Sequence, residues 1–374
     1  MNYILKYEDL QLGDIILESG HKPHSYAIKK YTESNFSHAM ICVEGMSIIH
    51  AEKKGIFSLN PQRLLVENIT DLRVLRFNQK LSNDELKNIE FFLRDKIGSV
   101  YSVKEAFSIT NESRKDENYN KYQFCSRLVA QAYKYIGHMI VTDVDFCSPA
   151  DIEKSNLLYE VKDIVRKAEK HDIDFALTRN MIKENQESMY KWLNKTRDIA
   201  NEKYNFIISK VNDVDNFLLK YPNEDSTICN LIIQSGYLEN YLIEVANNPH
   251  MHDENIFIEK FKDIDNIIYA LENEFSNIPS HTNRHIQSYN NSLLNYRNTT
   301  FGYYKLHIEL YKKLLGVSLS RFITLFNVSK KLILDVKKNE NLMILMSYCQ
   351  QNIEILQQLE IEKYNKNLER NSLP

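Results

Sequence analysis

The spacing of hydrophobic positions changes along the chain. Before about residue 160, short runs rich in Ile and Val lie between turn residues, a pattern typical of strands. These runs are DIILES (14–19), AMICVEG (39–45), SIIHAE (47–52) and LRVLRF (72–77). From about residue 160 the apolar residues recur every three or four positions, which predicts helices. The pattern therefore predicts a mixed first part and a helical second part.

Two helices of the first part have recognisable ends. The segment SNDELKNIEFFLRDKIG (82–98) begins with a capping signature and stops at Gly98. After Cys125, apolar residues form one stripe of a second helix, which ends at Gly137. Cys125 is therefore expected at or next to the N-terminal end of that helix.

Glycine usage supports a division of the chain. Six of the nine glycines lie in the first 137 residues, so turns concentrate there. We predict an α+β domain over residues 1–160 and an all-α helical bundle over residues 161–374. Within the bundle, Pro279 predicts a helix start just before His281.

Composition limits the classes of function. The chain has 374 residues, is 43% hydrophobic and 26% charged, and has a formal net charge of -3. It should bury sizeable cores, and it has no basic field that would favour nucleic acid as a partner. No stretch is long enough to be a transmembrane segment. No signal peptide is evident, so we expect a cytoplasmic protein, and export by a route without a cleaved signal stays open.

The cysteines do not form a metal or disulfide pattern. They are scattered, odd in number and contain no CxxC pair, which argues against a disulfide framework and a thiolate zinc site. The five are Cys42, Cys125, Cys147, Cys229 and Cys349. A single cysteine combined with distant histidines is instead typical of a candidate nucleophile.

Cys125 has the position of a reactive thiol. Free N–H groups and the positive dipole end at a helix start stabilise a thiolate. The N–H groups of Cys125 and Ser126 could also bind an oxyanion. The alternative is that Cys125 is a buried core thiol.

Two histidines are predicted to meet across a hairpin. Gly45 marks a tight reversal between the strands of His38 and His50. If the turn centres there, residue 40 opposes residue 50, and the two histidines share a face with side-chain roots about 7 Å apart. His38 could then act as a base, and a second imidazole could orient it. A register slip of one residue would place them on opposite faces.

Four motifs resemble one enzyme family. GDIIL (13–17), SHAMI (37–41), IIHA (48–51) and FCSRLVAQAY (124–133) resemble the permuted branch of the NlpC-type papain-like cysteine hydrolases. The YiiX-like amidase group looks nearest, and lecithin:retinol acyltransferase is more distant. The resemblance implies a permuted papain-like fold with an antiparallel sheet and helices over residues 1–160.

The resemblance also implies roles for single residues. His38 corresponds to the base, His50 to the third polar residue and Cys125 to the nucleophile. In the YiiX-like group the third residue is usually Glu, so His50 is a departure. Glu52 is the alternative orienting residue, because it would lie directly opposite His38.

Other side chains offer weaker chemistry. Tyr101 and Tyr122 could donate to a substrate or an oxyanion, and aromatic packing against the sheet is the alternative. His281 and His285 have the i,i+4 spacing of a helical metal site but lack the accompanying glutamate of HExxH. The HMH sequence at 250–252 is interpreted as a loop. We expect no metal ion and no organic cofactor.

Together these features predict a cysteine amidase or peptidase that works through an acyl-enzyme. The expected substrate is a peptide, an amide or an acyl-lipid. One alternative is a lipid acyltransferase or a thioesterase. Another is a catalytically degenerate papain-like binding module, whose helical domain would contact a protein, a membrane surface or a second copy of the chain.

Overall fold

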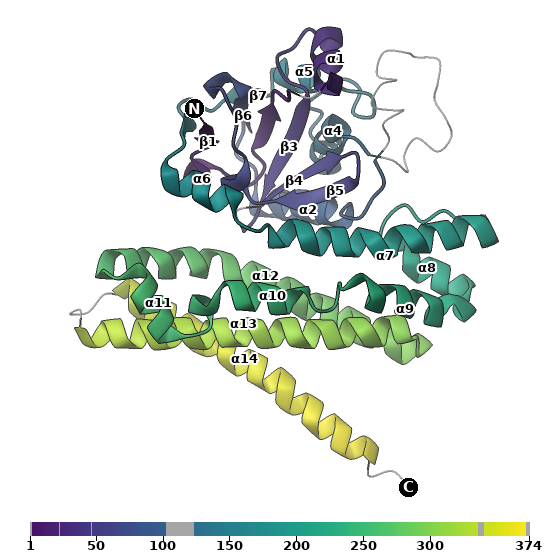
Figure 1. The fold of residues 1–374 in the computed structure, drawn as a ribbon, viewed down its shortest axis with the longest axis vertical. Coiled ribbons are helices and arrows are strands. Elements are labelled where there is room, and N and C mark those ends of the chain that lie inside the picture. The colour runs from purple at the N-terminus through teal and green to yellow at the C-terminus, as the bar shows by residue number, and fades with distance from the viewer. Residues whose placement is uncertain (1, 22, 46, 102–122, 336–339, 372–374) are drawn as a thin grey trace. The chain divides into compact units, whose positions relative to one another are not determined.

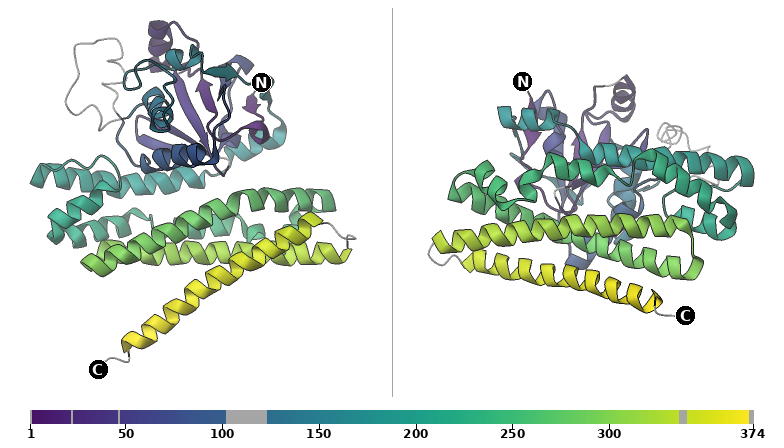
Figure 2. Two further views of the ribbon diagram at one scale, coloured as in Figure 1. Left: turned by 180° about the vertical axis from the view of Figure 1, so that it is seen from behind. Right: turned by 60° about the horizontal axis from the view of Figure 1, so that its bottom comes forward.

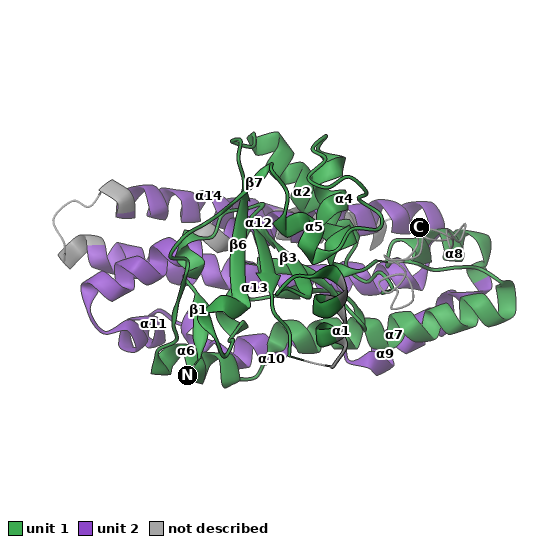
Figure 3. Cartoon of the chain, turned by 90° about the horizontal axis from the view of Figure 1, so that it is seen from above, with its two compact units in different colours: residues 1–222 green, residues 223–374 purple. Residues whose placement is uncertain are grey.

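The computed structural model describes most of the chain. The described residues are 2–21, 23–45, 47–101, 123–335 and 340–371. They pack as two compact units, residues 1–222 (unit 1) and 223–374 (unit 2), coloured separately in Figure 3. Unit 1 combines helices with an antiparallel sheet, and unit 2 is helical in its described part.

In the described part of unit 1 the strands form two sheets. The larger sheet has the strand order β5-β4-β3-β2-β6-β7, with antiparallel neighbours, and β1 pairs with β8 (Figure 1). The strands are β1 Tyr3–Leu5, β2 Ile15–Glu18, β3 His38–Val43, β4 Ser47–Glu52, β5 Gly55–Leu59, β6 Leu72–Phe77, β7 Leu158–Glu160 and β8 Val165–Lys167. The four predicted strands are therefore confirmed as β2, β3, β4 and β6.

The helices of unit 1 begin where the sequence has end signals. At the start of α2, Ser82 Oγ accepts the N–H of Glu85, and the Glu85 carboxylate accepts the N–H of Ser82, which confirms the predicted capping box. The described helices are α1 Pro23–Thr32, α2 Asn83–Asp95, α4 Cys125–Tyr135, α5 Pro149–Glu153, α6 Lys170–Leu177, α7 Met181–Tyr204 and α8 Asp213–Lys220.

Both faces of the larger sheet are buried at its centre. Ala39 and Ile41 of β3 pack with Leu128 and Val129 of α4 on one face, where α2 also contributes. Met40 and Cys42, which alternate with Ala39 and Ile41 along β3, pack on the opposite face against residues such as Leu64 and Ile164. Because side chains alternate along a strand, residues in phase with Met40 lie on the face away from α4.

The long helix α7 belongs to unit 1 because it covers an edge of the sheet. The Tyr190 hydroxyl accepts the N–H of Ile56 (2.7 Å) and donates to the C=O of Ile56 (2.9 Å). The Gln186 amide bonds to the N–H and C=O of Ser58. Unpaired edge groups are costly to bury, so these side chains complete strand β5. The sequence pattern turns helical near residue 160, whereas the packing division lies at residue 222.

Unit 2 consists of helices around a shared apolar core. Its described helices are α9 Asp225–Ser235, α10 Asn240–Asn247, α11 Glu254–Phe261, α12 Ile264–Thr299, α13 Gly302–Asp335 and α14 Glu340–Asn371. Helices α12 and α13 run side by side, and α14 packs against α13 (Figure 2). Phe257, Leu271 and Phe322 are fully buried in this core. Among the described residues, no helix has the length and apolarity needed to cross a bilayer.

One local prediction in unit 2 is wrong. Pro279 was expected near a helix start, but it lies inside α12, which is continuous from Ile264 to Thr299. Packing along α13 on both sides of the proline outweighs the loss of one backbone hydrogen bond.

We expect Tyr190→Phe to destabilise unit 1 by about 1–3 kcal/mol, because the N–H and C=O of Ile56 lose their side-chain partner in a buried place. Urea unfolding followed by the fluorescence of Trp192, the single tryptophan, measures this, since Trp192 is buried in α7. Tyr135→Phe, at an exposed tyrosine, is the matched control. Equal stability of the two variants would contradict the edge-covering role of α7.

We also expect unit 2 to lose stability in acid. Burial lowers the pKa of His285 from 6.5 to about 4, so the folded unit keeps this ring neutral while the unfolded chain takes up a proton below pH 6.5. The stability of unit 2 should therefore fall from about pH 6.5 to about pH 4. Urea titrations followed by circular dichroism measure the slope, which His285→Gln should reduce and His281→Gln, at an exposed position, should not. An unchanged slope in His285→Gln would refute the assignment.

Candidate active site

The hairpin of β3 and β4 has the predicted register. Met40 lies opposite His50, and Ile41 lies opposite Ile49. His38, two residues before Met40, is therefore in phase with Met40, on the face of His50. His38 Nε2 lies 3.0 Å from His50 Nδ1, within hydrogen-bond distance, and the rings meet edge to face at 74°. The two candidate histidines are in direct contact.

Glu52 approaches the second histidine from its other side. Glu52 Oε1 lies 3.4 Å from His50 Nε2. The Glu52 carboxylate is exposed, whereas His50 is only 6% exposed. Burial lowers the pKa of His50 to about 4, so this imidazole is neutral at pH 7. The three side chains thus lie in the order His38, His50, Glu52.

Cys125 is the first residue of α4, as expected. It is only 7% exposed, and this burial raises the pKa of its thiol. Hydrogen bonds from the backbone N–H groups of Ala39 and Ser126 act in the opposite direction and favour the thiolate. The expected stabilisation at the helix start is therefore present, but desolvation outweighs it, and the resting group is a thiol.

The contact with Ala39 joins the helix start to the histidine strand. Ala39 directly follows His38 in β3. The pairing of β3 with β4 begins at Met40, so the N–H of Ala39 lies beyond the end of that ladder. This contact places Cys125 next to the backbone of Ala39 at the end of β3, whereas the side chain of His38 is in phase with Met40, on the face of the sheet away from the body of α4.

The accessory candidates have different outcomes. Tyr101 is half-buried and forms an isolated bridge with Gln123, and burial together with the nearby Cys125 raises the pKa of its phenol. Tyr122 lies outside the described residues. The Ser126 hydroxyl donates to the C=O of Cys147 (2.7 Å).

Arg127 was missed in the sequence. Its side chain is fully buried, its Nε donates to the C=O of Asp145 (2.7 Å), and its guanidinium lies 4.4 Å from the centre of the Phe124 ring. A buried arginine next to the candidate nucleophile fixes the start of α4 to the segment around Asp145. The sequence signal that could have revealed it is a charged residue, Arg127, placed between Cys125 and the apolar Leu128 of the same helix.

The histidines of the helical part do not gather. His281 Nδ1 lies 2.8 Å from Arg284, His250 Nε2 lies 2.8 Å from Lys260 Nζ, and His285 faces the ring of Tyr311. Across the residues that the structure describes, no group of three or more His, Cys, Asp or Glu side chains is placed to bind a metal ion.

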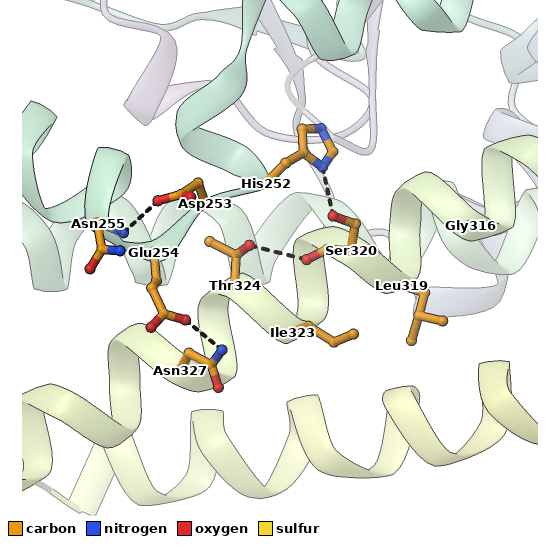
Figure 4. Close-up of a pocket in the computed structure, with 10 residues that line it drawn as sticks. All are labelled: His252, Asp253, Glu254, Asn255, Gly316, Leu319, Ser320, Ile323, Thr324 and Asn327. Atoms are coloured by element: carbon orange, nitrogen blue, oxygen red, sulfur yellow. Dashed lines mark hydrogen bonds between the residues drawn. The ribbon is translucent and has the colours of Figure 1, made fainter.

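Unit 2 contains a polar pocket of about 520 Å³ between the start of α11 and α13 (Figure 4). His252 Nδ1 lies 3.1 Å from Ser320 Oγ, and Glu254 accepts a hydrogen bond from Asn327. Glu254 also forms an ion pair with Lys331 (3.0 Å). Several polar groups of this pocket are bonded to one another, whereas the buried Nε2 of His252 has no hydrogen-bond partner among the described residues.

Comparisons with known proteins add little to these contacts. No family model matches the chain, and no curated protein does. The chain is similar to the crystal structure of metalloprotein YiiX from Escherichia coli O157:H7, at 18% identity and a TM-score of 0.31, over 40% of this chain and 96% of that chain. A similarity this low does not define the fold or the activity.

We expect the imidazole of His50 to stay neutral until the pH falls to about 4, because burial disfavours its charged form. The pH dependence of its ring proton shifts in NMR spectra measures this, with the urea-unfolded chain as the reference that titrates near 6.5. The unfolded chain takes up a proton at His50 near pH 6.5, whereas the folded unit does so only near pH 4. The stability of unit 1 should therefore fall as the pH drops from about 6.5 to about 4. A midpoint near 6.5 in the folded protein would show that His50 is not buried as described.

Proposed function

We propose that residues 1–160 form a permuted papain-like domain and that the protein is a cysteine hydrolase. In this proposal Cys125 is the nucleophile, His38 is the general base and His50 orients His38. The observation that supports it most directly is the His38–His50 contact of 3.0 Å, on the strand whose Ala39 N–H bonds the Cys125 sulfur. The order of the four motifs in the sequence supports the same assignment.

The ring of His38 has one nitrogen for each partner. Its Nε2 is bonded to His50, so Nδ1 is the atom that takes the proton of the thiol. The thiolate of Cys125 then attacks the carbonyl carbon of the substrate, and the His38 imidazolium returns the proton to the leaving group. Water, activated by the neutral His38, breaks the acyl–sulfur bond and releases the second product.

Burial of the thiol is compatible with this sequence of steps. A thiol whose pKa is raised by desolvation stays protonated until a base lies next to it. Proton transfer to His38 creates an ion pair in a site with little water, where opposite charges attract strongly. The N–H groups of Cys125 and Ser126, at the helix start, are the proposed donors to the tetrahedral oxygen.

The motifs favour an amide bond, so we propose an amidase or peptidase that acts on a peptide or another amide. Ester and thioester bonds react by the same steps, and an acyl-lipid is the corresponding substrate for a thioesterase or an acyltransferase. No step of this mechanism uses a metal ion or an organic cofactor.

We expect iodoacetamide to alkylate Cys125 much faster than Cys229 or Cys349 at neutral pH. His38→Ala should slow the labelling of Cys125 by about a hundredfold or more, because the base is lost. His138→Ala is the matched control, since His138 lies beyond the other end of α4 and pairs with Glu85. Peptide mapping by mass spectrometry gives the rate at each cysteine.

A second measurement tests the covalent step. Incubation with model peptide amides, esters and acyl-thioesters should add one acyl group at Cys125, detectable by intact mass, and Cys125→Ser should abolish thioester formation. Slow, equal labelling of all cysteines together with no acyl adduct would overturn the enzymatic assignment and favour the binding module.

A further inference from the structure

We propose that Glu52 is a positioning residue that selects the tautomer in which His38 can accept the proton of Cys125. The inference rests on the proposed function and deepens it, because it adds a fourth side chain that never touches the substrate. It is based on the order of contacts His38, His50, Glu52, with 3.0 Å between the two imidazoles and 3.4 Å between His50 and the carboxylate.

The hydrogen bond between the imidazoles has two alternative directions. In the first, His50 donates its Nδ1–H to His38 Nε2. A neutral His38 then has its own proton on Nδ1, the atom that should receive the thiol proton. In this arrangement His38 cannot act as a base towards Cys125.

The second direction gives a competent base. His38 donates its Nε2–H to His50 Nδ1, so His38 Nδ1 has no proton of its own and can accept one. A neutral His50 then has its proton on Nε2, the nitrogen that faces Glu52 at 3.4 Å. Only this arrangement places a proton on the nitrogen that lies nearest the carboxylate.

The Glu52 carboxylate favours the second arrangement. An ionised carboxylate only accepts hydrogen bonds, so a His50 Nε2 without a proton would direct its lone pair at a negative charge. Because His50 is only 6% exposed, little water surrounds its ring to screen this repulsion. Glu52 therefore acts on His38 through the tautomer of His50, in the way that a carboxylate orients an imidazole in other hydrolytic sites.

The carboxylate also assists after the proton has moved. The thiol proton travels from Sγ of Cys125 to Nδ1 of His38, which becomes an imidazolium, and no bond to Glu52 forms or breaks. Neutral His50 lies between this imidazolium and the Glu52 carboxylate, so its polarisation lets the carboxylate stabilise the new positive charge on His38.

The direct test is the tautomer of His50 in ¹⁵N-histidine-labelled protein at pH 7. Long-range ¹H–¹⁵N spectra distinguish a ring with its proton on Nε2 from one with its proton on Nδ1. The wild type should show the Nε2–H form for both His38 and His50. Glu52→Ala should shift His50 towards the Nδ1–H form, whereas Glu44→Ala, an exposed glutamate of the same hairpin, should leave it unchanged.

Kinetics give an independent readout. Alkylation of Cys125 by iodoacetamide should be about tenfold slower in Glu52→Ala, a smaller loss than in His38→Ala. Glu52→Gln should lie between Glu52→Ala and the wild type, since its amide oxygen still offers a partial negative charge near His50 Nε2. Unchanged melting of the variants shows that unit 1 stays folded, which is expected for a side chain that is 53% exposed.

The outcomes separate this inference from the proposed function. A reactive Cys125 whose rate and His50 tautomer do not respond to Glu52→Ala overturns the role of Glu52 and leaves the hydrolase intact. An unreactive Cys125 in the wild type overturns the hydrolase, and the tautomer measurement still decides whether Glu52 orders the histidine pair. A wild-type His50 in the Nδ1–H form overturns the inference directly.

Discussion

The register of β3 against β4 is the constraint on which the candidate site depends. With Met40 opposite His50, the two imidazoles occupy one face and meet at 3.0 Å. A slip of one residue would move His50 into the apolar layer under α4 and separate it from His38. The register is well defined because both faces are buried, and because Gly45 adopts a positive φ of 79° in the turn, which glycine adopts without strain.

The electrostatics of the site depend on desolvation more than on paired charges. Burial raises the pKa of Cys125 and lowers that of His50, so both groups are neutral at rest. A neutral resting site costs less to bury than a thiolate–imidazolium pair. The Glu52 carboxylate is exposed and lies 3.4 Å from Nε2 of the buried His50. In the proposed mechanism, charge separation therefore occurs only when a substrate supplies a carbonyl group and the helix-start N–H groups stabilise its oxygen.

Local signals in the sequence were sufficient for the parts of the site made by neighbouring residues. The strands of His38 and His50, the turn at Gly45 and the helix start at Cys125 each follow from a few adjacent residues. The covering of β5 by Tyr190 was not predictable, because the two segments are 134 residues apart and nothing near Ile56 indicates its partner. The continuation of α12 through a proline depends in the same way on packing with another helix.

The position of Cys125 also depends on contacts that sequence periodicity does not reveal. The segment 145–147 bonds to three side chains of α4: Ser126 donates to the C=O of Cys147, Arg127 to the C=O of Asp145, and Gln131 to the Asp145 carboxylate. These bonds attach the helix on one side, and on the other side the Ala39 N–H lies close enough to the sulfur to favour its thiolate form. The proposed proton transfer between Cys125 and His38 would require such a fixed placement of the start of α4 beside β3.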